Sequence, residues 1–137
     1  MVHTTTLAVR FNELDPYAHV NHAVYATYCE VARTEALTFI GLSIEELGRR
    51  GFQFVVTELS LRFRKPAVGG DVLLIDSWLS EIGRASSRWS QRIRRGDKLL
   101  IEAELKVGVA NNLGRPARPT PEIIETLRSL YEAPGDP

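Results

Sequence analysis

The chain has 137 residues, which is enough for one domain with one hydrophobic core. Apolar residues make up 44% of it and charged residues 25%, the balance of an ordinary soluble globular protein. The formal net charge is zero, which excludes a general electrostatic attraction to nucleic acid or to an anionic membrane.

The first predicted elements are a strand and a long helix. The strand spans Thr4 to Phe11 and ends at the turn-forming segment from Asn12 to Pro16. The helix runs from about Asn21 to Ile40, where Gly and Pro are absent and apolar residues fall on nearly every face. We therefore expect it to be buried on nearly all sides and to be roughly 30 Å long. Gly41 ends it, and Ser43 is expected to cap a short second helix.

From Phe52 onward, apolar and polar residues alternate, which predicts β-strands. Four such runs are separated by glycine-containing breaks, and the short breaks between the last three predict antiparallel hairpins. In the first run, Val55, Leu59 and Phe63 are expected on one apolar face. The four runs are Phe54–Lys65, Asp71–Glu81, Arg84–Arg95 and Lys98–Asn111.

After the strands, Thr120 is expected to cap a final helix, which is followed by a frayed tail from Ala133. The succession of strand, long helix and meander predicts an α+β fold in which a curled antiparallel sheet wraps around a long central helix. The sheet has a free edge, so a dimer that pairs two sheets edge to edge is expected. We predict a single domain over residues 1–137.

Polar residues gather immediately before the long helix, between Asp15 and His22. The start of a helix has unpaired N–H groups that attract developing negative charge. Asp15 is therefore a candidate catalytic carboxylate, although a turn aspartate bonded to its own loop is a common alternative. His19 and Asn21 are expected to orient the carboxylate, the loop or a substrate carbonyl, and Asn21 is equally suited to cap the helix.

These residues resemble the hotdog-fold thioesterases of the 4-hydroxybenzoyl-CoA thioesterase type and their relatives that act on acyl-CoA or acyl-carrier-protein thioesters. The resemblance covers the chain from about residue 6 to Arg118. Its specific part is a strand ending in Arg-Phe, followed by Asp15, His19-Val20-Asn21, Tyr25, and Glu30 with Arg33. Ala18 stands where the similar proteins usually have Gly, and His22 where they have a second Asn.

The resemblance implies a hotdog fold and a thioester hydrolase with Asp15 as its catalytic carboxylate. The carboxylate would act as a general base on water or attack the thioester directly. Backbone N–H groups near Asn21 to Ala23 would bind the carbonyl oxygen. His22, Ala23 and Tyr25 are candidate substrate contacts, although aromatic packing is the expected main role of Tyr25.

Other charged residues have competing explanations. Another branch of the hotdog thioesterases has its carboxylate on the central helix, so Glu30 or Glu35 is the rival base, and Glu30 is also a candidate substrate contact. An ion pair between Glu30 and Arg33 on the same helix is the preferred explanation. Arg115 and Arg118, in a proline-rich loop, suit the phosphates of coenzyme A or are simply solvated. The arginine-rich run from 84 to 95 is explained by cross-strand charge pairs rather than by nucleic acid, since Trp89 falls on its opposite side.

Asp15, His19 and His22 also invite a zinc site, but the sequence signals no fourth ligand, so no metal is expected. We expect no cofactor, because coenzyme A would be part of the substrate. The single cysteine, Cys29, is expected to be a buried inert thiol. The chain shows neither a secretion signal nor a membrane span, so a cytoplasmic protein is predicted, as a homodimer or a homotetramer built as a dimer of dimers.

The predicted function is hydrolysis of acyl-CoA or acyl-carrier-protein thioesters. One competitor is a hotdog hydratase or dehydratase, but the proline-spaced histidine motif of the bacterial dehydratases is absent from this sequence. A second competitor is a non-catalytic hotdog protein that binds acyl-CoA.

Overall fold

The computed structural model describes residues 1–133, so most of the predicted tail lies outside the described residues. Along the chain, a strand and a single 3-10 turn precede two helices, and four strands follow before a last helix. The elements are β1 (His3–Ala8), η1 (Phe11–Glu13), α1 (His22–Phe39), α2 (Ile44–Arg49), β2 (Phe52–Phe63), β3 (Val72–Ile82), β4 (Ser86–Arg95), β5 (Lys98–Asn111), α3 (Pro121–Leu127) and η2 (Arg128–Leu130).

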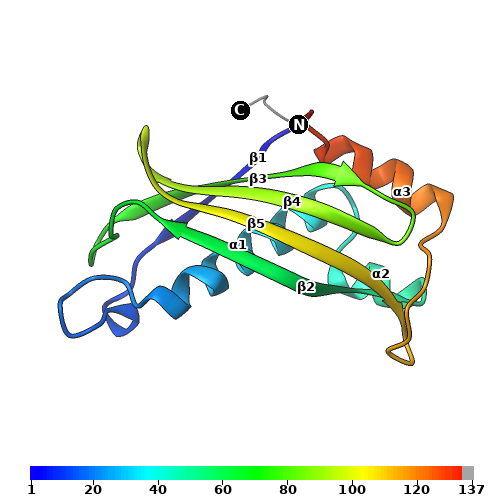
Figure 1. Cartoon of the computed structure of the whole chain (residues 1–137), viewed down its shortest axis with the longest axis horizontal. Helices are drawn as coiled ribbons and strands as arrows, with labels where there is room; N and C mark the ends of the chain where they lie inside the picture. The colour runs from blue at the N-terminus through cyan, green and yellow to red at the C-terminus, as the bar shows by residue number, and fades with distance from the viewer. Residues whose placement is uncertain (134–137) are drawn as a thin grey trace.

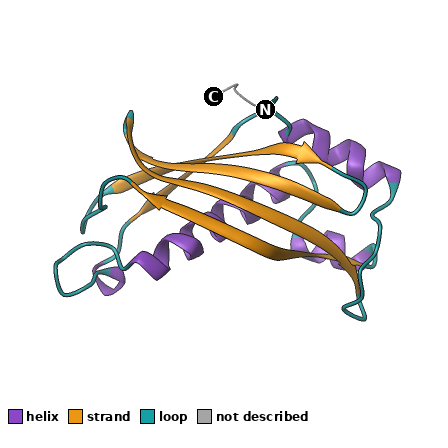
Figure 2. Cartoon of the chain, in the orientation of Figure 1, coloured by secondary structure: helices purple, strands orange, loops and turns teal. Residues whose placement is uncertain are grey.

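The strands form one five-stranded sheet in the order β1-β3-β4-β5-β2, and every neighbouring pair is antiparallel. The sheet curls over α1, which crosses behind it in Figure 1. The two short helices lie toward the other end of the molecule from the start of α1 (Figure 2). This is the α+β arrangement that the sequence predicts. Among the described residues, no helix is long and apolar enough to cross a membrane.

The first strand is shorter than predicted. It ends at Ala8, and the predicted continuation to Phe11 is replaced by the turn η1. The reason is a local capping pair: the Glu13 carboxylate accepts hydrogen bonds from the backbone N–H and the guanidinium of Arg10, at 2.9 and 3.0 Å. This pair bends the chain toward the loop that precedes α1.

Helix α1 is buried along one face only, so the prediction that nearly all of its sides are buried is wrong for a single chain. The sheet covers one side of the helix, whereas Val31 on the other side is 40% exposed. Small side chains at Ala32 and Ala36 let the sheet approach closely. The buried residues are Tyr25, Tyr28, Cys29, Ala32 and Ala36.

Strand β2 contains a β-bulge that corrects the predicted position of Val55. Val56 pairs with Val107 and Leu59 pairs with Leu105, so the extra residue between them shifts the alternation. Val55 pairs with Gly108 and therefore lies on the outer, charged face of the sheet. A regular alternation read from the sequence does not anticipate this shift.

The outer face is held by charge pairs between strands, as predicted. Asp76, which is 2% exposed, contacts the guanidinium groups of Arg92 and Arg94 at 3.2 and 2.8 Å. Trp89 faces the core and is 2% exposed, also as predicted. The sequence analysis overlooked Trp78, whose ring lies on the outer face 4.9 Å from the Arg92 guanidinium carbon.

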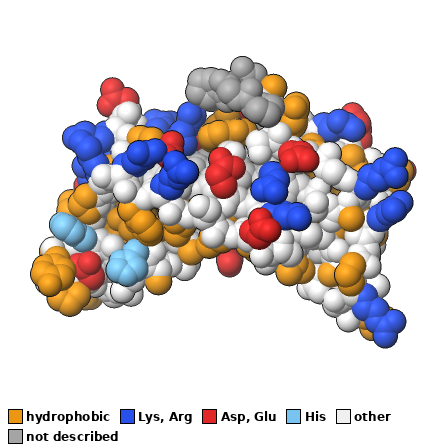
Figure 3. Space-filling view, viewed as in Figure 1, with side chains coloured by type: hydrophobic (Ala, Val, Ile, Leu, Met, Phe, Trp, Pro, Cys, Tyr) orange, Lys and Arg blue, Asp and Glu red, His pale blue; other side chains and the backbone are white. Residues whose placement is uncertain are grey.

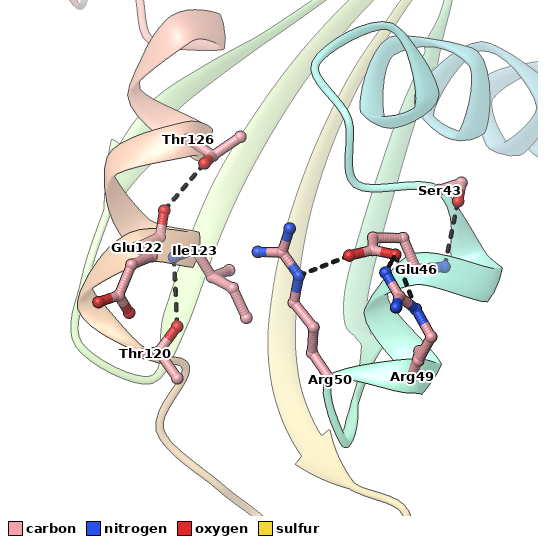
Figure 4. Close-up of polar contacts among 8 residues, drawn as sticks. All are labelled: Ser43, Glu46, Arg49, Arg50, Thr120, Glu122, Ile123 and Thr126. Atoms are coloured by element: carbon pink, nitrogen blue, oxygen red, sulfur yellow. Dashed lines mark hydrogen bonds and ion pairs between the residues drawn. The ribbon is translucent and has the colours of Figure 1, made fainter.

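The short helices begin at the predicted caps. The Ser43 hydroxyl accepts a hydrogen bond from the Glu46 N–H at 3.1 Å, and the Thr120 hydroxyl accepts one from the Ile123 N–H at 3.3 Å (Figure 4). Glu46 also pairs with Arg49 and Arg50 in α2. These contacts stabilise the start of each helix and the end of α2.

Asp76→Asn is expected to lower the free energy of unfolding by about 2 kcal/mol at pH 7, because it removes the charge from the hydrogen bonds with Arg94 and Arg92. Burial alone would raise the pKa of Asp76, but hydrogen bonds from Arg94 and Thr4 outweigh it and hold the pKa below its usual value. The carboxylate therefore stabilises the fold above the unfolded-state pKa, and this stabilisation is lost as the pH falls through the lowered folded-state pKa.

Urea unfolding at pH 7 and pH 3 measures both effects, and the difference between the two proteins should shrink at pH 3. A difference of equal size at both pH values would contradict the role of the charge. Glu125→Gln, at an exposed ion pair on α3, is the control and should change stability by less than about 0.5 kcal/mol.

Candidate active site at the start of helix α1

A cleft of ≈ 450 Å³ lies at the start of α1, and we call it the α1 cleft. One wall is the loop that precedes the helix, and the other is the end of β2 with the residues that follow it. In Figure 3, histidine and hydrophobic side chains gather at this end of the molecule. The lining residues are Asp15, His19, Val20, His22, Tyr25, Phe63, Arg64, Lys65 and Pro66.

The loop folds around the Asp15 carboxylate. Its Oδ1 accepts hydrogen bonds from the backbone N–H groups of Tyr17 and His19, at 2.8 and 3.1 Å. The Asp15 N–H donates to the His19 carbonyl, which closes the loop. Within residues 1–133, Oδ2 has no hydrogen-bond partner. Asp15 thus has one oxygen fixed by its own loop, as the turn alternative requires, and a second oxygen left for chemistry.

The helix start has one unused donor. The Asn21 carboxamide oxygen accepts from the Ala23 N–H at 2.9 Å, so Asn21 caps α1. The Asn21 N–H donates to the Glu13 carbonyl at 2.9 Å. Of the three predicted donors, the N–H groups of Asn21 and Ala23 are therefore engaged. In the described part of the chain, the His22 N–H has no partner, so it is the remaining candidate donor for a carbonyl oxygen.

Two tyrosines tie the cleft to the rest of the fold. The Tyr25 hydroxyl accepts a hydrogen bond from the Ala67 N–H at 3.0 Å, which holds the chain after β2 against α1. The Tyr28 hydroxyl donates to Glu13 Oε1 at 2.8 Å. The pKa of Tyr28 is raised, first by burial and then by this bond to the carboxylate. Tyr25 therefore has a structural role as well as its place in the cleft wall.

His19 in the loop and His22 at the start of α1 are both exposed at the mouth of the cleft. The ring of His22 packs edge-on against Phe63, with ring centroids 6.2 Å apart. In the described chain, no three His, Cys, Asp or Glu residues are arranged to hold a metal ion. Cys29 is fully buried, and burial raises the pKa of its thiol to about 11, as expected for an inert residue.

Glu30 lies outside the α1 cleft, on the exposed side of α1. The predicted ion pair with Arg33 is wrong. Arg33 turns instead toward the sheet and donates a hydrogen bond to Gln91 Oε1 at 3.0 Å. Gln91 is 1% exposed, so the guanidinium reaches a buried polar group that the helix pattern alone did not reveal.

Arg115 and Arg118 also lie outside the α1 cleft. Their loop follows β5 and is held by a hydrogen bond from the Asn111 N–H to the Arg115 carbonyl. It lies at the opposite end of the molecule from the loop before α1 (Figure 1). A single chain does not bring these arginines to Asp15.

Four further lining residues escaped the sequence analysis as part of the site: Phe63, Arg64, Lys65 and Pro66. They lie at the end of β2 and just after it, and they form no recognisable sequence motif. Only the path of β2, which runs back toward the start of α1, brings them to the cleft. Arg64 is already paired with Glu102 at 2.7 Å. Lys65 is exposed beside the cleft.

Comparison with known proteins decides the family. Residues 17–102 match the thioesterase superfamily. The chain belongs to the thioesterase superfamily. By this membership it is a thioesterase, an enzyme of the hydrolase class, and the hotdog fold predicted from the sequence is confirmed.

Individual relatives agree with this assignment. The chain is 32% identical over 131 residues to the chloroplastic acyl-acyl carrier protein thioesterase ATL3 of Arabidopsis thaliana, covering 94% of this thioesterase and 67% of the relative. It is 30% identical to the acyl-CoA thioester hydrolase YbgC of Escherichia coli, covering 85% and 87%. A hypothetical protein from Thermus thermophilus has the same fold, with a TM-score of 0.90, 33% identity and coverage of 96% and 99%.

Ala18 provides a test of the loop that positions Asp15. Its φ is 63°, a left-handed conformation that disfavours any residue with a Cβ. Ala18→Gly is expected to raise the free energy of unfolding by up to about 1 kcal/mol, and Ala18→Val to lower it, because branching at Cβ increases the clash. Urea unfolding of the three proteins measures the order, and equal stability of the Val variant and the wild type would contradict the assigned conformation.

Proposed function

We propose that this thioesterase hydrolyses acyl-CoA or acyl-carrier-protein thioesters in the α1 cleft, with Asp15 as its catalytic carboxylate. The observation that carries the proposal is the pairing of two groups at one place. Asp15 has one oxygen fixed by two backbone N–H groups and the other unpartnered within residues 1–133. The unused His22 N–H lies at the positive end of α1.

The chemistry needs few groups because a thioester is already activated. In the general-base route, Asp15 takes a proton from water while the water oxygen attacks the carbonyl carbon. The carbonyl oxygen becomes an oxyanion and accepts a hydrogen bond from the His22 N–H. Collapse of this intermediate breaks the C–S bond, and the thiolate takes up the proton from Asp15. In the alternative route, the Asp15 carboxylate attacks the carbonyl carbon, and the C–S bond breaks to release the thiolate. Water then hydrolyses the acyl anhydride, which restores the Asp15 carboxylate, and the thiolate takes up the proton that the water gives.

The other loop residues support these two groups. Asn21 caps the helix and so keeps the Ala23 N–H occupied, which leaves the His22 N–H as the donor. His19 contributes its backbone to the Asp15 loop, and its imidazole stands at the cleft mouth. We assign the rings of His22 and Tyr25 to the wall that contacts the substrate beside the thioester.

A homodimer follows from the free edge of β2. This strand has 12 residues, and its inner-face side chains Val56, Leu59 and Phe63 are 43%, 46% and 54% exposed. Unpaired N–H and C=O groups along such an edge favour pairing with another strand. Antiparallel pairing of β2 with its copy satisfies both edges through one two-fold axis. A homotetramer would be a dimer of these dimers.

The same two-fold axis gives Arg115 and Arg118 a role. The axis reverses the direction of β2, so the loop after β5 of one chain comes to the end where the other chain has its Asp15 loop. The two exposed arginines of that loop suit the phosphates of coenzyme A. Cytoplasmic location and the absence of a cofactor stay predictions from the sequence.

Asp15→Asn tests the catalytic assignment. The Asn carboxamide oxygen keeps an acceptor for the Tyr17 and His19 N–H groups, so the loop should retain its fold while kcat falls about 100-fold or more. Thiol release from an acyl-CoA measures kcat, and circular dichroism checks the fold. Glu30→Gln is the matched control and should retain most of the activity. Unchanged kcat in Asp15→Asn, or a collapse only in Glu30→Gln, would move the base onto α1.

The combined variant Arg115→Met, Arg118→Met tests the arginine loop. We expect KM for an acyl-CoA to rise about tenfold, because two contacts with phosphate are lost. An acyl N-acetylcysteamine thioester has the same reacting bond without the nucleotide phosphates, and its KM should not change. Arg62→Met with Arg88→Met, on the outer face, is the control for charge alone. An equal rise in KM for both thioesters would contradict the assignment.

A further inference from the structure

A second cavity of ≈ 300 Å³ lies farther along α1, and we call it the distal cavity. Its floor and walls come from the second half of α1 and from the inner face of the sheet. Apolar side chains dominate it, including Leu37, Phe54, Val56 and Trp89. Two charged residues, Glu30 and Arg33, stand at its α1 wall.

Arg33 is poorly matched to an apolar cavity of this kind. Its guanidinium donates one hydrogen bond to protein, to the neutral Gln91 side chain. Gln91 is itself held by bonds to the Cys29 carbonyl and the Ser77 hydroxyl, both at 2.9 Å. No carboxylate within residues 1–133 lies within ion-pair distance of Arg33. Burial lowers the pKa of Arg33, and the nearby charge of Glu30 offsets this effect only in part.

The distal cavity lies in line with the α1 cleft. Along α1, the residues that face β2 follow helical spacing from His22 in the cleft to Glu30 and Arg33 in the cavity. Along β2, the inner face runs from Phe63 in the cleft to Phe54 in the cavity through exposed Leu59. We call this line of exposed apolar side chains between the two hollows the furrow.

We propose that the distal cavity receives the far end of the acyl group, and that Arg33 binds a carboxylate at that end. This inference rests on the proposed function, because it extends the substrate from the thioester carbonyl at the start of α1. It assigns the enzyme to ω-carboxyacyl thioesters, which have an apolar chain and an anionic terminus.

The length of the furrow fixes the size of the chain. From His22 to Arg33 the helix rises about 16 Å, at ~1.5 Å per residue. An extended chain advances roughly 1.3 Å per carbon, given C–C bonds of ~1.5 Å, so about 12 carbons span this distance. Dodecanedioic acid, linked through one carboxyl group to coenzyme A, therefore matches the furrow.

The charge of the cavity selects the terminus. A carboxylate accepts two parallel N–H bonds from a guanidinium and gives Arg33 the anion that it lacks. A methyl terminus would bury the Arg33 guanidinium further, and it would supply no hydrogen-bond acceptor in place of the water that the guanidinium lost. Glu30, the other charged residue of the wall, is exposed and carries a negative charge that repels an anion, so Arg33 is the residue of the wall that suits a carboxylate.

Competition between two thioesters of equal length tests the proposal on the wild-type enzyme. The ω-carboxyundecanoyl thioester, which is the 12-carbon mono-thioester of dodecanedioic acid, should be hydrolysed with a kcat/KM at least tenfold higher than that of the dodecanoyl thioester. In Arg33→Met this preference should disappear, whereas Arg33→Lys should keep part of it. Arg88→Met, on the outer face, is the control and should keep all of it. An equal kcat/KM for both thioesters in the wild type would overturn the proposal, as would an unchanged preference in Arg33→Met.

A binding measurement separates this proposal from the proposed function. Trp89 lines the distal cavity, and the second tryptophan, Trp78, lies on the outer face, so Trp78→Phe leaves Trp89 as the reporter. Its fluorescence should saturate with dodecanoate, whose carboxylate can reach Arg33, at a concentration at least tenfold lower than with the uncharged 1-dodecanol. The difference should vanish when Arg33→Met is added. Equal affinity for the two compounds would overturn the carboxylate site even if thioesters are cleaved, whereas a preference for dodecanoate supports the site even if none is cleaved.

Discussion

The start of α1 is the constraint on which the proposed active site depends. When Asn21 caps the helix, its side chain occupies the Ala23 N–H and its own N–H reaches back to the Glu13 carbonyl. These two bonds fix the loop before the helix, and that loop in turn fixes one oxygen of Asp15. A charged acceptor and an unused N–H donor are thereby set at one place by short-range contacts. Such prior placement of charge is the main source of catalytic power at a carbonyl group.

The long-range contacts hold this arrangement against the sheet. Tyr25 and Tyr28 lie one helical turn apart and reach opposite walls, the segment after β2 and the segment before α1. Arg10 supports the contact between Tyr28 and Glu13. Burial alone would raise the pKa of Glu13, but the hydrogen bonds from Arg10 outweigh this effect and lower the pKa of that carboxyl group. Hydrogen bonds thus fasten the segment before α1 and the segment after β2 to the helix that lies between them.

The fold could be predicted from the sequence because its signals are local. Each of these signals depends on residues that are neighbours along the chain. They are the helical run to Phe39 without Gly or Pro, the caps at Ser43 and Thr120, and the alternation of apolar and polar residues in the strands. The features that the sequence did not reveal depend on contacts between residues that are far apart along the chain. Val55 was misplaced because a bulge opposite β5 shifts the alternation, and the Glu30–Arg33 pair failed because Gln91, far along the chain, offered Arg33 a buried partner.

The same division applies to the site. Asp15, His19 and His22 line one cleft because they lie close together in the loop and the first residue of α1, whereas Arg115 and Arg118 are separated from them by the length of the sheet. No pattern within one chain reveals that a two-fold axis through β2 would reunite them. The exposed face of α1 and the exposed side chains of β2 have the same explanation in a proposed second copy.

The central claim is that the α1 cleft cleaves thioesters, and the most direct measurement is thiol release by the wild-type enzyme from a panel of aryl, short-chain and long-chain acyl-CoA thioesters. The account predicts catalytic turnover of at least one class. Binding of coenzyme A derivatives without cleavage of any thioester in the panel would contradict it and would indicate a protein that binds acyl-CoA without catalysis.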